Sequence, residues 1–466
     1  MKESKIGLWS LTALVFSSMV GAGIFSLPQN MAEVAGARAV LIGWAVTGVG
    51  ILALAMSFLY LSRLRPELDG GIYSYARAGF GDLVGFFSAW GYWLCATIGV
   101  VGYLVIAFAA LGSFVDTPER VWFGEGNTLA AFVGESCILW AVHLLVARGV
   151  QQAVLFNLVA TLAKSLPLLL FILFACYWFD PVTFAADQQG STLATPVSEQ
   201  VRNTMLITLW VFTGIEGAAV LSARARNRRD VGTATVLGVV LALLLYVLIS
   251  VLALGILSRP ELAALPNPSM AGLMAQMTGS WGKLLISAGL IVSVLASYVS
   301  WTLFSAEVPF SAARHGAFPA IFRRQNRNGT PIASLWLTSL TVQGCLLLVW
   351  LLGKGYTNLL LVSTSMILVP YLLIGLFLLK LAFSGQGNLL MRAVALVSSS
   401  YGLWLLYAAG VEYLLLSLLL YGPGLLLFLY SRRQLGAEQP LSGRERLLAG
   451  VTLLSLIPAV WSFAHV

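Results

Sequence analysis

Charged side chains are scarce in this sequence. They make up only 10% of its 466 residues, whereas hydrophobic residues make up 59% and the mean hydropathy is +0.88. A fold built from such a chain cannot cover itself with a water-compatible surface. The composition therefore excludes a water-soluble protein and indicates that lipid surrounds most of the chain.

Cysteines and patterns for catalysis are sparse as well. The four cysteines, Cys95, Cys137, Cys176 and Cys345, lie within or beside apolar runs without metal-ligand spacing, so we interpret them as packing residues. The spans show no metal-ligand cluster, and the sequence has no nucleotide-binding loop and no acidic-pair motif in a cytoplasmic segment. We therefore expect no metal, no cofactor and no enzymatic activity.

Long apolar runs are abundant. A helix of about 20 apolar residues crosses a hydrocarbon core of roughly 30 Å, and the unbroken runs here differ from the short alternating segments of a β-barrel. The sequence predicts an all-α polytopic membrane protein with twelve spans and a thirteenth candidate. The expected spans are 7–28, 39–62, 80–114, 129–147, 150–178, 201–222, 231–257, 282–311, 333–352, 357–381, 391–410 and 412–431, with 447–464 as the thirteenth.

Positive charges are distributed unevenly between the connecting segments. With the N-terminus in the cytoplasm, twenty of the 27 Lys and Arg residues fall in cytoplasmic segments, six in external segments and one, Lys164, in a span. The positive-inside rule therefore predicts a cytoplasmic N-terminus, and the first span is expected to be retained. We interpret the basic run 224–229 as a topology anchor, with a lipid-headgroup or partner site as the second interpretation, and expect no nucleic-acid partner.

Glycines interrupt two of the spans at matching places. The first span carries Gly21-Ala22-Gly23, and the sixth, five spans later, carries Thr213-Gly214-Ile215-Glu216-Gly217. Glycines in membrane helices commonly serve close packing alone. Paired breaks in two successive five-helix units instead indicate an inverted-repeat transporter with its substrate near the midplane. The expected units of this single domain, 1–466, are about 7–178 and 201–381, with accessory helices over 391–466.

Free backbone groups at such breaks suit a zwitterion. Unpaired amides where the first helix restarts after Gly23 would bind a carboxylate, and carbonyls freed where the sixth helix stops would bind an ammonium group. The sequence thus predicts a site for the α-amino and α-carboxyl groups of an amino acid.

Two ionisable residues lie deep in apolar spans, where a charge is costly unless it faces a cavity or a partner. Glu216 could pair with the backbone for packing alone, but it could also attract a cationic substrate or take up a proton. Lys164 has about ten apolar residues on each side, so its side chain does not reach an interface easily. We expect its ammonium to take the place of a coupling cation.

Aromatic residues flank these positions. Trp210, Trp301, Tyr92 and Trp93 would each serve packing when taken singly. Together they could hold the alkyl stem and charged tip of a cationic substrate through cation–π contacts.

At these residues the sequence resembles the amino acid/polyamine/organocation transporter superfamily, and within it the basic amino acid/polyamine antiporters, over nearly the whole chain. The matching motifs are Val20-Gly21-Ala22-Gly23-Ile24-Phe25, Asp69-Gly70-Gly71-Ile72-Tyr73-Ser74-Tyr75-Ala76, Trp210-Val211-Phe212-Thr213-Gly214-Ile215-Glu216, Ser300-Trp301-Thr302-Leu303, Gly316-Ala317-Phe318-Pro319 and Val369-Pro370-Tyr371.

The resemblance implies a LeuT-type fold of two inverted five-helix repeats, with helices 1 and 6 discontinuous. It also implies exchange of an external amino acid for an internal product. The implied substrate-binding residues are Val20, Gly21, Ala22, Gly23, Ile24, Tyr92, Trp210, Phe212, Thr213, Gly214, Glu216, Trp301, Ser363 and Thr364. The implied gating or coupling residues are Tyr75, Glu216 and Lys164.

Departures from the arginine/agmatine antiporters refine the expectation. Those proteins carry asparagine where this chain has Val100, and they have no lysine at the position of Lys164. In its length, in this lysine and in the possible thirteenth helix, the chain looks more like the arginine/ornithine antiporters. The favoured expectation is exchange of external arginine for internal ornithine in a bacterial inner membrane. Three alternatives of function stay open: proton-coupled uptake of broader specificity, exchange of another pair (lysine/cadaverine, arginine/agmatine or histidine/histamine), and an amino-acid sensor. A homodimer also stays open.

Overall fold

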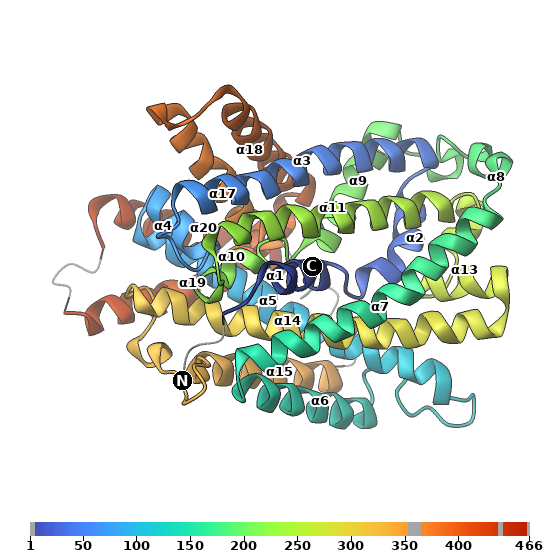
Figure 1. Cartoon of the computed structure of the whole chain (residues 1–466), viewed down its shortest axis with the longest axis horizontal. Helices are drawn as coiled ribbons and strands as arrows, with labels where there is room; N and C mark the ends of the chain where they lie inside the picture. Colours follow the sequence, from blue (N-terminus) through green and yellow to red (C-terminus); the bar gives the residue numbers. More distant parts are fainter. Residues whose placement is uncertain (1–4, 353–364, 437–440, 464–466) are drawn as a thin grey trace.

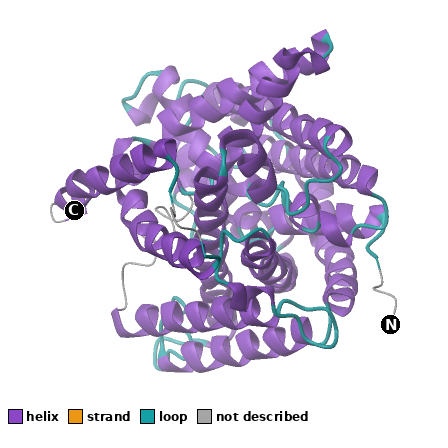
Figure 2. Cartoon of the chain, turned by 90° about the vertical axis from the view of Figure 1, so that its left-hand side faces the viewer, coloured by secondary structure: helices purple, strands orange, loops and turns teal. Residues whose placement is uncertain are grey.

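A computed structural model describes residues 5–352, 365–436 and 441–463. Over these residues the chain is helical, without a β-strand beyond isolated bridges (Figures 1 and 2). Nine described helices are each long and apolar enough to cross a membrane, and the bent pair α1 (Leu8–Met19) and α2 (Gly23–Val34) makes a tenth candidate. The expected all-α polytopic membrane fold is confirmed.

The helices follow the expected spans closely. The long helices are α3 (Ala37–Leu64), α5 (Asp82–Val115), α6 (Leu129–Ala147), α7 (Val150–Trp178), α11 (Arg228–Ala253), α14 (Ser280–Arg314), α15 (Ile332–Leu352), α17 (Leu368–Leu381), α18 (Leu389–Ala409), α19 (Val411–Gln434) and α20 (Gly443–Phe463). The sixth expected span is α9 (Val197–Phe212) followed by α10 (Gly217–Val220). Helix α20 occupies the thirteenth candidate segment, and the start of the expected tenth span lies outside the described residues.

Short helices between the spans were not predicted. They are α4 (Ile72–Phe80), α8 (Pro181–Ala186), α12 (Arg259–Ala263) and α13 (Ser269–Thr278). A search for apolar runs of membrane-spanning length does not find such helices, because the short helices are stabilised by packing against neighbouring helices. In α13, for example, Met270, Leu273 and Met274 are buried where the helix packs on α14 and α2.

Helices α1 and α10 lie in the middle of the molecule, surrounded by α5, α7, α11 and α14 (Figure 1). Two-thirds of the apolar window of α5 and of α14 is buried, against 28% of that of α15, which packs with α6 at the periphery. The central helices therefore face other helices, whereas the peripheral ones present apolar side chains to lipid.

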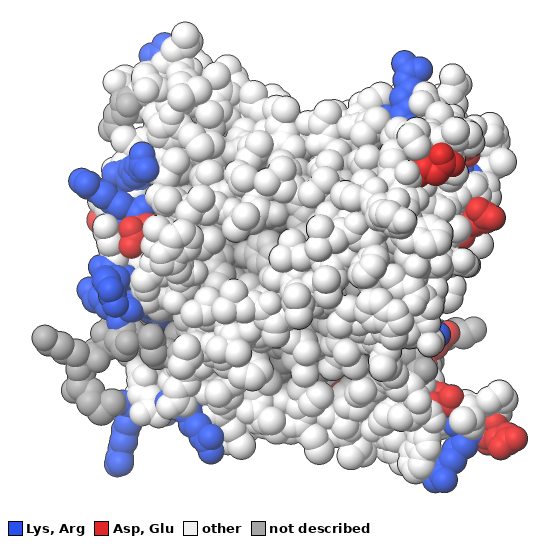
Figure 3. All heavy atoms as spheres, turned by 45° about the vertical axis from the view of Figure 1, so that its right-hand side comes forward, with Lys and Arg blue, Asp and Glu red and all other residues white. Residues whose placement is uncertain are grey.

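Basic side chains gather at one end of the molecule, on the left in Figure 3. We call this end, which carries Arg224, Arg226, Arg228 and Arg314, the arginine-rich end; the opposite end carries α8 and α12. The lateral surface between them is almost uncharged in this view, as a lipid-facing belt requires.

Candidate functional site: two broken helices and an aromatic pocket

The first break separates α1 from α2, which are bent by 42° relative to each other. The Gly21 amide donates to the Met19 carbonyl at 2.8 Å, outside the helical pattern, and α2 starts at Gly23. The first amides of α2 and the last carbonyls of α1 have no partner within their own helices. The break therefore places backbone donors and acceptors in the middle of the protein.

Side chains from α7 and α14 occupy the carbonyl end of this break. The buried Lys164 ammonium donates to the carbonyl oxygens of Ser17 (3.0 Å) and Val20 (2.5 Å) and to the Ser17 hydroxyl (2.9 Å). Ser297 donates to the Ser17 carbonyl at 2.7 Å, and Ser293 to the Val20 carbonyl at 3.0 Å. A positive charge at the C-terminal end of α1 also complements the helix dipole. The ammonium thus lies in a cage of oxygen atoms.

The second break lies between α9 and α10 and touches the first. The Ser18 hydroxyl donates to the Gly214 carbonyl at 3.0 Å, and a Cβ on Gly214 would lie 2.6 Å from that hydroxyl oxygen. Gly214 also has a φ of +112°, which side chains disfavour. A Cβ on Gly23 would lie 2.8 Å from the Trp210 ring. Glycine is therefore required where the two unwound segments cross.

Glu216 lies in the second break and is fully buried. Its Oε2 accepts a hydrogen bond of 2.6 Å from the Tyr371 hydroxyl, which itself accepts one of 3.4 Å from the Gly214 amide. Glu216 Oε1 and the buried Tyr92 hydroxyl have no hydrogen-bond partner within the part of the chain that the structure describes. Tyr92 lies close enough to Glu216 to interact with its carboxylate, and buried polar atoms are normally paired, so the two groups together offer a polar place for a ligand or water.

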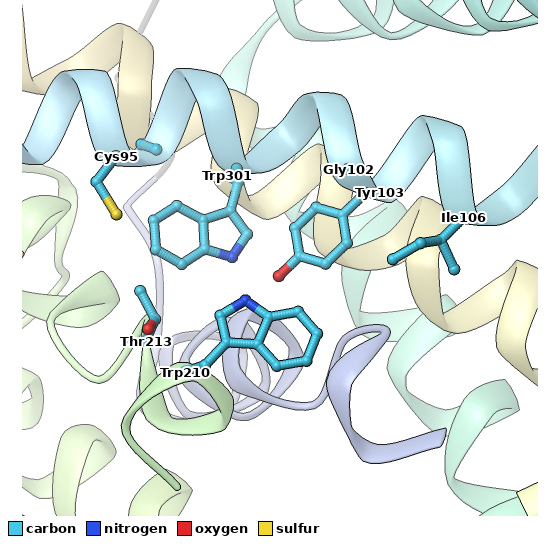
Figure 4. A pocket seen from close by; sticks show the side chains of 9 residues that line it. Cys95, Gly102, Tyr103, Ile106, Trp210, Thr213 and Trp301 are labelled. Carbon is cyan, nitrogen blue, oxygen red and sulfur yellow. The ribbon is translucent and has the colours of Figure 1, made fainter. Parts of the chain in front are cut away.

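A pocket lies beside the crossing and is walled by α5, α9 and α14 (Figure 4). Two indole rings, Trp210 and Trp301, and the phenol of Tyr103 surround it, with Thr213 and Cys95 at one side. Its volume is about 40 Å³, room for about three waters. An amino acid therefore enters only after these walls separate.

The structure brings together part of the predicted site. Of the expected residues, Trp210, Thr213 and Trp301 line the pocket, and Tyr92 stacks on Trp301 with ring centroids 6.1 Å apart. Glu216 does not line the pocket in this conformation.

Other expected residues lie elsewhere. Phe212 packs edge-on against Tyr246, on the side of α9 that faces α11. Tyr75 stacks on Phe377 of α17 and does not line the pocket. Ser363 and Thr364 lie outside the described residues.

Sequence reasoning missed several residues of the site. Tyr103 could not be told apart from the many other aromatic residues of the spans, and we interpreted Cys95 as a packing residue. The oxygen cage around Lys164 had a clearer signal, because Ser293, Ser297 and Ser300 recur at helical spacing along one face of α14.

Ion pairs and hydrogen bonds connect the elements at the arginine-rich end. Arg224, just after α10, pairs with Glu307 of α14 at 3.0 Å and donates to the Gly329 carbonyl at 3.0 Å. The Ile6 amide donates to the Arg224 carbonyl at 2.9 Å, so the N-terminal segment is hydrogen-bonded to the segment that follows α10. Arg228 pairs with Asp69 nearby. These contacts join the broken-helix core to α14.

A buried arginine organises the opposite end. Arg259 donates to the Asp187 carboxylate at 2.8 Å and to the Ala32 carbonyl, at the end of α2, at 2.9 Å, and it also contacts Thr192. It therefore ties the far end of α2 to the loop before α9.

Comparisons with known proteins agree with this architecture. The family model described as "Amino acid permease" matches residues 6–436. A protein of Escherichia coli (strain K12) named "Putative arginine/ornithine antiporter" is 59% identical over 98% of this chain and 99% of its own length. An "Arginine/ornithine antiporter" of Pseudomonas aeruginosa is 46% identical over 98% and 97%, and an "Arginine/agmatine antiporter" of Chlamydia pneumoniae is 40% identical over 98% and 96%.

The family match covers most of the chain, and these relatives are similar over nearly their whole length. The all-α, multi-pass membrane fold agrees with that match. The chain belongs to the amino acid permease family of membrane transporters.

Proposed function

We propose that this protein exchanges external arginine for internal ornithine by alternating access. The observation that carries the proposal is the crossing of two broken helices beside a pocket walled by Trp210 and Trp301. The arginine/ornithine antiporter names of relatives at 59% and 46% identity support the same substrates. The arginine/agmatine name of a relative at 40% supports antiport of arginine in general.

The site residues have separate roles in this proposal. The amides at the start of α2 bind the substrate carboxylate, and backbone carbonyls at the second break bind its α-ammonium. The alkyl stem and cationic tip lie between the indoles of Trp210 and Trp301, where a cation–π contact contributes up to about 2 kcal/mol once water is removed. Glu216, whose Oε1 is free, supplies the compensating negative charge.

Lys164 serves as a fixed cation in this proposal. It fills the oxygen cage between α1 and α14, so exchange proceeds without an inorganic cation at this position. Because arginine and ornithine carry the same charge, exchange of the two is electroneutral.

The membrane orientation follows from the charge distribution. The arginine-rich end faces the cytoplasm of a bacterial inner membrane, with the N-terminus on that side. The two five-helix units are about 7–178 and 201–381, and the helices over 391–466 are accessory. The conformation described here is then closed toward the cytoplasm by the Arg224–Glu307 pair.

Flux in proteoliposomes tests the proposal. Uptake of labelled arginine is measured into vesicles preloaded with ornithine, agmatine, cadaverine, histamine or buffer alone. Fast uptake with ornithine and none with buffer is the expected result. Equal uptake into vesicles without amino acid, increased by external acid, would instead support the second candidate, proton-coupled uptake, which the ionisable Lys164 favours.

A further inference from the structure

Asn157 joins three helices at the first break. It lies on α7 two turns before Lys164, and its side chain is fully buried. Its Nδ2 lies 3.1 Å from the Ser17 hydroxyl of α1, 2.8 Å from the Ala296 carbonyl of α14 and 2.5 Å from the Ser300 hydroxyl of α14. A single amide group thus contacts the last turn of α1 and the serine-bearing face of α14.

Chemistry fixes the orientation of this amide. The Ala296 carbonyl can only accept a hydrogen bond, so the NH₂ group of Asn157 and not its oxygen faces α14 and α1. An NH₂ group can only donate. Because the group has two hydrogens for three oxygen atoms, the hydroxyl oxygens of Ser17 and Ser300 accept from Asn157 with one hydrogen shared between two of the three acceptors.

The Ser17 hydroxyl also faces Lys164. Its oxygen lies 2.9 Å from the Lys164 ammonium, which likewise can only donate. With Asn157 and Lys164 both donating, the hydrogen of the Ser17 hydroxyl points away from both and its lone pairs point toward them. Without Asn157 the hydroxyl loses one of the two donors that hold its lone pairs in this orientation, and only Lys164 still orients it.

We propose that Asn157 is a positioning residue for substrate binding. It holds the last turn of α1 against α14 and orients the Ser17 hydroxyl as an acceptor for Lys164. Through that turn it fixes the unwound backbone from Val20 onward in the geometry that grips a substrate. This inference rests on the proposed function, because it takes the first break as part of the substrate site.

If Asn157 served packing alone, it would be buried just as it is, but the effect of replacing it on exchange would not depend on whether Ser17 is present. Thr161 is the matched control, because it is buried on α7 one turn from Asn157 and its hydroxyl donates to the Asn157 carbonyl within the same helix at 2.6 Å. That hydroxyl also lies 3.4 Å from Asn157 Oδ1, the amide atom opposite the NH₂ group, so removing it leaves the contacts of the NH₂ group with α1 and α14 in place. A loss of general packing would therefore appear in both variants, whereas a positioning effect would appear only at Asn157.

The test measures arginine/ornithine exchange by purified full-length protein in proteoliposomes. Asn157→Leu, which keeps the branched shape without the polar atoms, is compared with Ser17→Ala, the double variant and Thr161→Val, and KM and the maximal rate are determined separately. We expect KM to rise about three- to tenfold in Asn157→Leu, as for loss of one hydrogen bond, with a smaller change in the maximal rate. The double variant should be no worse than Ser17→Ala alone, and Thr161→Val should resemble the wild type.

Three results would overturn the inference: an unchanged KM in Asn157→Leu, effects of Asn157→Leu and Ser17→Ala that multiply, or an equal rise in Thr161→Val. Should Asn157→Leu fail to insert, Asn157→Ser gives the same test, because its hydroxyl is polar but too short to reach α1. A wild-type protein that does not exchange arginine for ornithine would refute the proposed function instead. The two failures are therefore distinguishable.

Discussion

Arg224 and Glu307 form a buried ion pair of 3.0 Å that connects the segment after α10 with α14 beneath the broken helices. Their side chains are only 14% and 5% exposed. Because the pair bridges the broken-helix core and α14, opening of the arginine-rich end requires it to separate.

The first prediction concerns this pair. Glu307→Ala leaves the largely buried Arg224 without its carboxylate partner, with only the Gly329 carbonyl still accepting from it; loss of one partner of a buried pair costs up to about 3–5 kcal/mol, and opening relieves that cost by hydrating Arg224. We expect the open conformation to become populated. Cys95 in the pocket, with the other three cysteines replaced by serine, should then react with an impermeant thiol reagent applied at the arginine-rich end. Glu67→Ala, which breaks the more exposed pair with Arg65, should leave labelling unchanged.

The second prediction concerns Glu216. Glu216→Ala should reduce arginine exchange at least about tenfold, because a hydrogen bond to a charged group contributes about 1.5–3 kcal/mol. Insertion and oligomeric behaviour in detergent should be unaffected. The matched control is Glu135→Gln, a buried acid of α6, which does not contribute to the pocket walls. Wild-type exchange in Glu216→Ala, or equal losses in both variants, would contradict the role given to Glu216.

The third prediction concerns substrate size. Gly99 lines the pocket, and a Cβ there would meet no atom within 4 Å, so a larger side chain fits the empty protein but fills space needed by the substrate. Gly99→Val should raise KM for arginine more than KM for the shorter ornithine. Gly344→Val is the control, because this glycine on α15 is equally open and lies outside the pocket. An equal rise for both substrates would show that Gly99 does not set substrate length.

The fourth prediction concerns the crossing of the breaks. Gly214→Ala places a methyl group 2.6 Å from the Ser18 hydroxyl at a φ of +112°, so we expect a destabilisation of about 1–3 kcal/mol from backbone strain alone. Thermal unfolding in detergent should occur at a lower temperature, and exchange should be lost. Gly450→Ala, where a Cβ meets nothing within 4 Å, should show neither effect.

The fifth prediction concerns acid at the opposite end. Partial burial raises the pKa of Asp187, but hydrogen bonds from Ser191 and Arg259 outweigh this effect and hold its pKa below the usual value. A carboxylate with a lowered folded-state pKa stabilises the protein above its unfolded pKa, about 3.9, and loses this contribution as the pH falls through the folded pKa. Hydrogen exchange at the end of α2 should therefore increase below about pH 4. Asp187→Asn should show the same increase at neutral pH and no further change on acidification.

The sequence predicted the architecture well because its strongest signals act locally. Apolar runs determine which segments lie in lipid, and the glycine groups at 21–23 and 214–217 mark where helices can unwind. The positions of α4 and α13 could not be predicted in this way, because short helices depend on neighbours distant in sequence.

The candidate site was predicted less completely for a similar reason. Lys164 and Glu216 stand out as charges within apolar runs, but nothing in the sequence identifies Ser17 or Tyr371 as their partners. Glu216 does not line the pocket beside Trp210 and Trp301 in the conformation described here. Only contacts between helices reveal this arrangement.

The small volume of the aromatic pocket has a consequence for the cell's energy supply. A passage that holds only about three waters between Trp210, Trp301 and Tyr103 admits no hydrated ion. On the proposed function, we therefore expect the empty transporter in this conformation to pass no hydrated ion through the pocket, and so not to dissipate the voltage of the membrane in which it lies.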